Sequence, residues 1–172
     1  MSLHEAPLDN AFWQHSLRRY AMPSVSAACL QLQDKYNANI NLLLLADWFG
    51  EQGIVITCKD WELLQATIYD WHTHVVSGLR KVRKYLKVDA QANAIAILRN
   101  NIKEQELFAE QITQSILYEQ AITLINMHDY QAQFTTVFAS QENIKNYFFI
   151  CLSVDIDQDA VCAESVVRLF SS

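Results

Sequence analysis

Apolar side chains recur at helical spacing along most of the chain. Val25, Cys29, Leu32 and Tyr36 follow the spacing i, i+4, i+7 and i+11, which places them on one face of a helix. Positions 40–49 are apolar almost without interruption, which indicates a helix buried on all sides. We expect helices over residues 10–20, 23–36, 39–51, 59–88, 90–127 and 140–152, and a last one from 155–159 to about 170.

Residues that cap helices support these boundaries. The side chain of Asp9 or Asn10 can accept hydrogen bonds from the first free amides of a helix. Pro23 suits a first turn, because its missing N–H would be unpaired there in any case. Thr57 with Asp60 three residues later resembles a capping box. These local signals and the apolar pattern therefore predict the same helix starts.

The two longest predicted helices, 59–88 and 90–127, are separated only by the capping residue Asp89, so we expect them to pack antiparallel as a hairpin. Their expected buried stripes are Trp61, Leu64, Ile68, Val75, Leu79, Val82 and Leu86, followed by Ile95, Leu98, Ile102, Ala109, Ile112 and Ile116. Residues 54–56 are apolar but isolated, and one strand cannot form a sheet, so we expect an extended linker there. The secondary structure of residues 130–139 stays ambiguous, and a short helix is compatible with their apolar pattern.

The composition agrees with helices. Of 172 residues, 51% are apolar, only three are glycine and only two are proline. A β-sandwich or barrel needs many turns, and turns depend on these two residue types. The length suits one domain. We therefore predict an all-α fold over residues 1–172, an irregular bundle of six or seven helices with a long central antiparallel helix hairpin.

Cysteine spacing and net charge bear on location and partners. Cys29, Cys58, Cys151 and Cys162 lack disulfide or zinc-site spacing, so we expect free thiols and a cytoplasmic protein. The acidic start of the chain does not resemble a signal peptide, and the longest apolar run, 42–46, is too short to span a bilayer. The net charge of −6 argues against general nucleic-acid binding, which depends on a basic surface.

The acidic residues Asp155, Asp157 and Asp159 match the start of a calcium loop. An EF-hand needs glycine at position six and glutamate at position twelve, where this chain has Ala160 and Val166. We interpret the segment as an acidic helix start, which the helix dipole favours. The chain also lacks a zinc-protease, nucleotide-loop or nucleophile motif. We therefore expect no metal and no cofactor, and the sequence leaves open whether the protein is an enzyme.

Five positive charges lie within residues 80–87, namely Arg80, Lys81, Arg83, Lys84 and Lys87. Such a cluster can bind phosphate, RNA or an acidic partner. Cations near the C-terminal end of a helix also interact favourably with the helix dipole without serving any function. Both interpretations stay open.

Two polar residues, Asn41 and Asp47, interrupt the apolar run of the third predicted helix. A buried polar group without a hydrogen-bond partner is unfavourable, so each should have one. The predicted hairpin would also bring two arginines, Arg80 and Arg83, against two glutamates, Glu106 and Glu110. These groups form either an ion-pair network that sets the helix register or a polar pocket that orients a ligand.

His72 and His74 do not form a metal site on a helix, because their side chains point about 200° apart. His72 projects onto the predicted apolar stripe with Ile68, Val75 and Leu79. A single inward histidine is more often a hydrogen-bonded core residue than a catalytic base.

One set of short motifs carries a resemblance to a known family: Phe12-Trp13, Ser16-Leu17, Tyr20, Ala28-Cys29-Leu30, Leu32-Gln33-Asp34, Asn41-Leu42-Leu43-Leu44, Trp48, Leu79-Arg80, Arg83, Glu106-Leu107 and Ala109-Glu110. With them, the chain resembles a small bacterial family catalogued as a domain of unknown function, over roughly residues 10–125. The resemblance implies an all-helical bacterial cytosolic protein and carries no activity with it. It also singles out one cluster of residues: Trp13, Asp34, Asn41, Trp48, Arg80 and Glu106.

Three functional hypotheses follow. The first is a helical protein-interaction or adaptor module, which would bind a second copy of itself or another protein through an exposed apolar patch. The second is a small-molecule binder or enzyme with a polar pocket inside the bundle, and the third is a weak anion or RNA contact through the basic helix end. We expect no membrane partner. The candidate ligand-binding residues are Trp13, Asp34, Asn41, Trp48, His72, Arg80, Arg83, Glu106 and Glu110.

Overall fold

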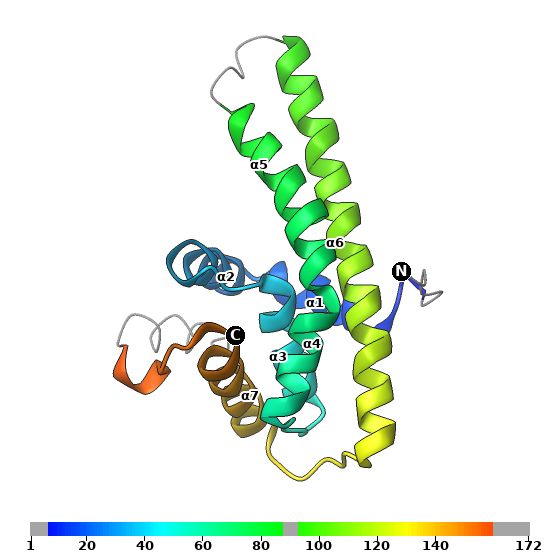
Figure 1. Ribbon diagram of the computed structural model, residues 1–172, viewed down its shortest axis with the longest axis vertical. Coiled ribbons are helices and arrows are strands. Elements are labelled where there is room, and N and C mark those ends of the chain that lie inside the picture. The colour runs from blue at the N-terminus through cyan, green and yellow to red at the C-terminus, as the bar shows by residue number, and fades with distance from the viewer. Residues whose placement is uncertain (1–6, 88–92, 160–172) are drawn as a thin grey trace.

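The computed structural model describes residues 7–87 and 93–159, which form helices and no strand (Figure 1). The α-helices are α1 (Ala11–Tyr20), α2 (Pro23–Tyr36), α3 (Ile40–Glu51), α4 (Cys58–Trp71), α5 (Ser77–Tyr85), α6 (Asn93–His128) and α7 (Thr136–Leu152). A π-helical turn, η1 (His72–Val76), joins α4 to α5, and a 3-10 turn, η2 (Ile156–Gln158), follows α7. The predicted all-α fold is confirmed. No helix within the described ranges has both the length and the apolar character that a membrane span requires.

Three of the predicted helix starts are confirmed by their capping contacts. The side chain of Asn10 accepts a hydrogen bond from the Trp13 amide at 2.9 Å, and Pro23 is the first residue of α2. Thr57 and Asp60 cap α4 reciprocally, each side chain accepting from the backbone of the other. These starts were predictable because each depends on residues within one helical turn.

Helix α7 begins earlier than predicted, at Thr136 rather than at residue 140. The side-chain oxygen of Thr135 accepts from the Phe138 amide at 3.4 Å and caps the helix there. Part of the ambiguous segment 130–139 is therefore helical. Of the last predicted helix, only the 3-10 turn η2 is described; its continuation toward residue 170 lies outside the described residues, as do Asp89 and Cys162.

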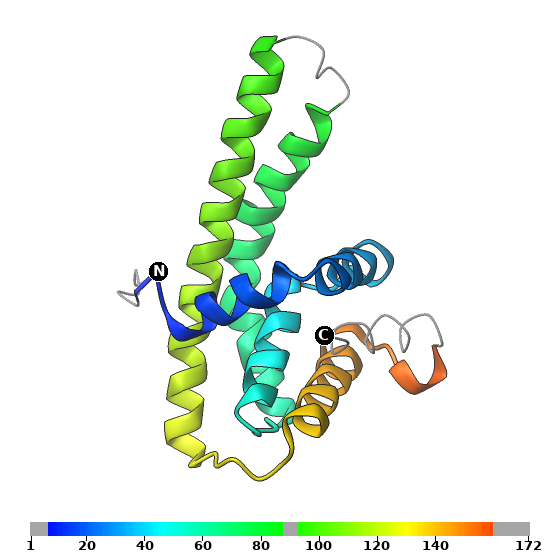
Figure 2. The same ribbon diagram turned by 180° about the vertical axis from the view of Figure 1, so that it is seen from behind.

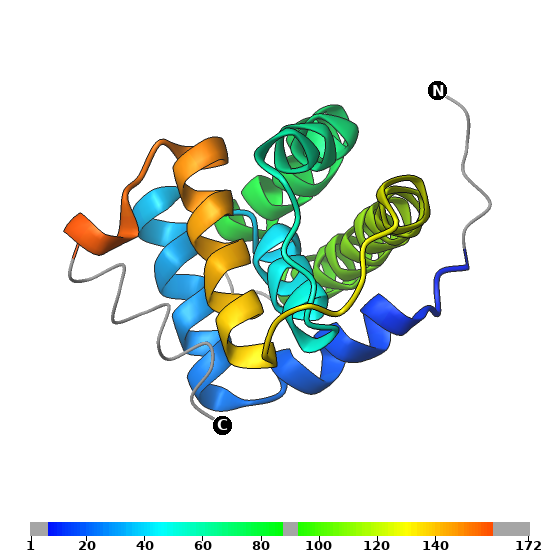
Figure 3. The ribbon, with the colours of Figure 1, turned by 90° about the horizontal axis from the view of Figure 1, so that it is seen from below.

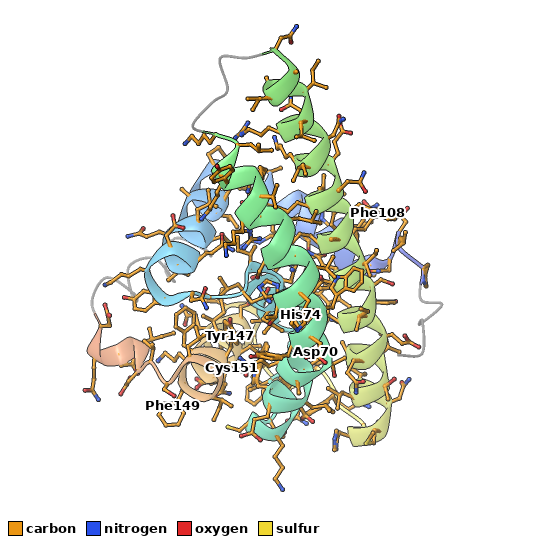
Figure 4. All side chains as sticks on the ribbon, turned by 45° about the horizontal axis from the view of Figure 1, so that its top comes forward. Asp70, His74, Phe108, Tyr147, Phe149 and Cys151 are labelled. Carbon is orange, nitrogen blue, oxygen red and sulfur yellow. The ribbon has the colours of Figure 1, made fainter. Side chains whose placement is uncertain are left out.

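The core is built around α3, which is buried along nearly its whole length. Helix α7 packs along it (Figure 3), and the approach is close: a Cβ added to Gly50 would lie 1.9 Å from the Ser140 hydroxyl oxygen. Tyr147 of α7 is buried in the core, whereas Phe149, two residues later, points outward from the same helix (Figure 4). The central position of α3 is what its continuous apolar run predicts.

Residues 54–56 form a linker outside any helix or strand, and a buried amide holds it in place. The Asn143 side chain accepts from the Ile56 amide at 3.0 Å and donates to the Ile54 carbonyl at 2.7 Å. Asn143 therefore gives this linker the hydrogen bonds that a neighbouring strand would otherwise provide.

The antiparallel hairpin consists of α4, η1 and α5 on one side and α6 on the other (Figure 1). Its upper part extends beyond the other helices, so α5 contains no buried residue, and the buried positions of α6 begin only at Glu106. The predicted stripes are therefore wrong in this part: Val82 is 45% exposed and Leu98 is 48% exposed. A helical pattern shows which positions share a face, but it does not show where the neighbouring helices end.

The π-helical turn η1 also shifts the stripe of the first hairpin helix. Val76 is fully buried, whereas Val75 and Leu79, which the α-helical spacing predicted to be buried, are only half-buried. His72 begins the turn and is half-buried as well, with its backbone N–H bonded to the Ile68 carbonyl and its Nδ1 atom buried. The physical reason for the shift is that a π turn adds residues to the turn and rotates all the positions that follow.

Candidate functional site

A cavity of about 300 Å³ opens where α1, α2, α3, α5 and α6 meet, and we call it the apolar cavity. Figure 2 shows α1 crossing the hairpin beside this junction. The apolar walls of the cavity consist of Trp13, Leu17 and Tyr20 from α1, Leu30 from α2, Ile40 and Leu44 from α3, and Leu107 from α6. The wall residues nearest to solvent are Leu17, Leu30 and Leu107, which are 46%, 47% and 58% exposed.

The helical spacing of α1 explains how it forms one wall. Trp13, Leu17 and Tyr20 share a face, as predicted, and this face lines the cavity together with buried Ser16, whereas Phe12 is buried in the core. The leucines of the walls, Leu17, Leu30 and Leu107, are partly exposed to solvent beside the cavity. They leave apolar surface that a ligand can cover.

An ion-pair network joins α5 to α6 at the polar end of the cavity. Arg80 donates from Nε to Glu106 Oε1 at 3.0 Å and from Nη2 to Glu110 Oε1 at 2.6 Å. Arg83 makes two further hydrogen bonds to the same Glu106 carboxylate, one of them from Nη2 to Oε1 at 3.1 Å. The pairing predicted for these four residues is confirmed. Bidentate pairs of this kind hold the side chains in one geometry.

The network continues into α3 through amide side chains. Asn41 donates from Nδ2 to Glu110 Oε2, and Gln114 donates from Nε2 to Asn41 Oδ1 at 2.9 Å. The partner predicted for buried Asn41 is thereby confirmed. Two buried oxygens of cavity-lining residues, Gln114 Oε1 and Ser16 Oγ, have no hydrogen-bond partner in the described chain.

The two glutamates of the network differ in their electrostatics. Burial opposes ionisation of Glu106, but hydrogen bonds from Arg83 and Arg80 outweigh it and hold the pKa of this carboxyl below its ordinary value. Burial raises the pKa of Glu110, because the hydrogen bond from Asn41 and the charge of Arg80 offset it only in part. Glu106 is therefore the fixed anion of the network, and Glu110 is the carboxyl that gains a proton more readily.

A second cavity of about 390 Å³ lies between α2 and the η1–α5 segment. We call it the basic cavity, and it is lined by Gln33, Asp34, Asn37, Ala38, His72, Ser77, Arg80, Lys81 and Lys84. Lys84 Nζ lies 4.0 Å from Asp34 Oδ1. Burial and the charge of Arg80 together lower the pKa of His72, so its imidazole is neutral near pH 7. The His72 Nδ1 atom is buried and has no hydrogen-bond partner within the described residues.

The candidate residues inferred from the sequence thus separate into three places. Six line the apolar cavity: Trp13, Asn41, Arg80, Arg83, Glu106 and Glu110. Asp34 and His72 line the basic cavity instead, with Arg80 shared between the two. Trp48 lies in the core against Phe12, 5.8 Å between ring centroids, and lines neither cavity.

Sequence reasoning missed several cavity residues, among them Leu30, Gln33, Lys103 and Gln114. Leu30 gave a usable signal, since it is a leucine outside the apolar stripe of its own helix. Gln33, Lys103 and Gln114 have residue types that usually lie on helix surfaces, and only the packing of the helices around the cavity identifies them.

Asp47, the second polar residue that interrupts the apolar run of α3, lines neither cavity. It accepts from Arg19 Nε at 2.7 Å and lies 3.1 Å from Nε2 of buried His15, whose Nδ1 is 3.0 Å from Glu51 Oε2. The predicted partner of Asp47 is confirmed, and its role is to tie α1 to α3. Within the described ranges, no three histidine, cysteine or acidic side chains form a group that could hold a metal ion.

A family model described as "Protein of unknown function (DUF2390)" matches residues 11–117. The match begins with α1 and ends within α6, so it includes every residue that lines the apolar cavity and the basic cavity. No curated protein and no solved structure matches the chain. Because the matched range covers more than half of the sequence, the chain belongs to the DUF2390 family.

Proposed function

We propose that the protein binds a small organic molecule in the apolar cavity. The observation that carries this proposal is the combination of exposed leucines on the walls with a polar end whose charges are already paired among themselves. Such a site accepts an apolar body and places a few polar groups where they fix its orientation. The volume of about 300 Å³ suits a ligand of modest size.

The unpartnered oxygens support a ligand that donates hydrogen bonds. Gln114 Oε1 is an acceptor only, and the Ser16 hydroxyl can donate or accept. Buried polar atoms nearly always have a partner, and one without a partner in the protein is satisfied by water or a ligand. A hydroxyl or amide N–H on the ligand would fit at this end of the cavity.

Binding of the neutral fluorophore N-phenyl-1-naphthylamine tests the proposal. Exchange of two wall leucines, Leu17→Gln with Leu30→Gln, should weaken binding about tenfold, because each contributes partly buried apolar surface. The matched control is Leu63→Gln with Leu98→Gln. These two leucines are 43% and 48% exposed and line neither cavity. Absence of binding to the unaltered protein, or equal weakening in both double variants, contradicts the proposal.

A second candidate function, interaction with another protein or with a second copy of the chain, is favoured by the projecting hairpin. Helix α5 has no buried residue, and Tyr85 near its end is 78% exposed beside Val82 at 45%. Exposed aromatic and apolar side chains are typical of interaction surfaces. Light scattering at about 50 μM tests self-association, and a dimer that Tyr85→Glu dissociates would support it. A monomer would leave another protein as the partner of this surface.

We infer a cytoplasmic location for either function. The described cysteines, Cys29, Cys58 and Cys151, are free thiols, which supports a reducing compartment. Detection of the tagged protein in a fractionated cell tests this inference, and recovery with exported proteins would contradict it.

A further inference from the structure

The apolar cavity and the basic cavity are neighbours in one cleft. Gln33 of α2 and Arg80 of α5 line both. Helix α5 packs against α6 and η1, and α2 packs against α1 and α3, so the cleft lies between two helices that do not pack tightly against each other. A molecule longer than the apolar cavity would therefore enter the basic cavity next.

The basic cavity carries an excess of positive charge. Arg80, Lys81 and Lys84 face one acidic residue, Asp34. The pair between Lys84 and Asp34 is long, at 4.0 Å, and both side chains are mostly exposed, so it is weak. Lys81 makes no ion pair within the described chain. Two ammonium groups are thus available to an anion.

Neutral hydrogen-bonding groups complete the lining. Ser77 contributes a hydroxyl, Asn37 an amide and His72 an imidazole with one unpartnered ring nitrogen. Arg80 is held in place by Glu106 and Glu110, so it is presented to the cleft without having to be ordered by the ligand. Preformed donors of this kind lower the entropy lost when an anion binds.

We propose that the basic cavity binds the anionic group of a ligand whose apolar body lies in the apolar cavity, so the ligand is an amphipathic anion, a carboxylate or a phosphate ester attached to an apolar chain. The inference rests on the proposed function. The adjacent leucine-rich walls favour such a molecule over the phosphodiester backbone of a nucleic acid, which has no long apolar segment.

Three ligands of equal chain length test the proposal in displacement of N-phenyl-1-naphthylamine: decanol, decanoate and decyl phosphate, each below the concentration at which it forms micelles. We expect at least one of the anions to bind about tenfold more tightly than decanol, since a charge-assisted hydrogen bond is about twice as strong as a neutral one. Preference for decanoate or for decyl phosphate identifies which head group the cavity takes. Equal affinity of both anions and decanol overturns the inference, although it leaves the proposed function intact.

Lysine variants locate the anionic group. Lys81→Gln with Lys84→Gln should remove the preference for the anion and leave the affinity for decanol and for the fluorophore unchanged. The control, Lys59→Gln with Lys87→Gln, removes the same charge from exposed lysines outside both cavities and should keep the preference. If both double variants lose the preference for the anion equally, the net charge of the protein determines this preference and the position of the lysines does not. If only Lys103→Gln removes the preference for the anion, the anion lies at the rim of the apolar cavity. Either of these two results overturns the inference.

The imidazole of His72 gives a second readout. An anion in the basic cavity stabilises the protonated ring, so its C–H proton resonances should titrate at higher pH with decanoate than with decanol. His72→Asn identifies the resonance by its loss. A titration that the anion leaves unchanged contradicts binding in the basic cavity. Failure of the fluorophore and of all three ligands to bind would contradict the proposed function itself.

Discussion

Arg80 donates to Glu110 at 2.6 Å across the hairpin, and the same arginine lies between the two cavities. Its guanidinium thus has a structural contact on α6 and borders both parts of the cleft. A side chain with these two positions couples the register of the hairpin to the shape of the cleft. The variants below separate this structural role from ligand binding.

We expect Arg80→Met to lower the free energy of unfolding by about 2–3 kcal/mol, because it leaves two partly buried carboxylates with less compensation. Urea unfolding followed by circular dichroism measures the change. The control is Arg18→Met: Arg18 is 62% exposed and lies 3.9 Å from Glu51, so its removal should change stability by less than about 0.5 kcal/mol. Equal effects of the two variants would contradict a structural role for the Arg80 network.

Glu106 and Glu110 should give pH dependences of opposite sign. The lowered pKa of Glu106 means that its stabilising contribution is present above the ordinary value of 4.5 and is lost as pH falls through the folded-state value. The raised pKa of Glu110 means that its contribution is present below 4.5 and is lost as pH rises through the folded-state value.

Urea unfolding of the unaltered protein, Glu106→Gln and Glu110→Gln between pH 4 and pH 7 tests this pair. The stability advantage of the unaltered protein over Glu106→Gln should grow with pH, and its advantage over Glu110→Gln should shrink. Parallel pH dependences of the two variants would show that both carboxyls titrate alike.

Substitution by alanine should have opposite effects on stability at two glycines. A Cβ on Gly50 would lie 1.9 Å from the Ser140 hydroxyl oxygen and 2.4 Å from its Cα, so Gly50→Ala forces α3 and α7 apart and should destabilise the protein by about 3 kcal/mol. A Cβ on Gly78 meets nothing within 4 Å, so Gly78→Ala should stabilise α5 by about 0.5–1 kcal/mol. Calorimetry measures both, and a lower melting temperature for Gly78→Ala would be inconsistent with the open surroundings of that position.

Asn143→Ala should be among the more damaging substitutions of a polar residue. It removes the groups that bond the Ile56 amide and the Ile54 carbonyl, which leaves both buried without partners and costs about 3 kcal/mol. Asn126→Ala, at an exposed position of α6, is the matched control and should change stability by less than about 0.5 kcal/mol. Equal unfolding midpoints for the two variants would refute the role of Asn143 in holding the linker.

The fold was predictable where short-range signals decide it, and the candidate site was predictable where polarity conflicts with burial. Asn10, Pro23 and Thr57 act within one turn, so their helix starts could be inferred without tertiary structure. Asn41 was identifiable because it interrupts an apolar run, but its partners Glu110 and Gln114 follow only from the packing of α3 against α6.

Tertiary packing decided the rest. The sequence placed Asp34 and Arg80 in one cluster, but Asp34 lines only the basic cavity, whereas Arg80 lines both. Trp48 was a plausible ring for a ligand site, and its neighbours turned out to be Phe12 and other core residues. No local property of a tryptophan distinguishes these two environments.

The π-helical turn of the hairpin has a consequence for how the chain tolerates length changes. A π turn holds one residue more than an α turn, because its hydrogen bonds join residues five apart instead of four. A one-residue deletion within His72–Val76 would therefore return the turn to α-helical geometry and keep α5 in place, with Arg80 and Arg83 still against Glu106. The same deletion within the regular helix between Ser77 and Arg80 would turn both arginines and the lysines of the basic cavity by about 100°, so a shortened chain is tolerated on one side of this boundary and disrupts the cleft on the other.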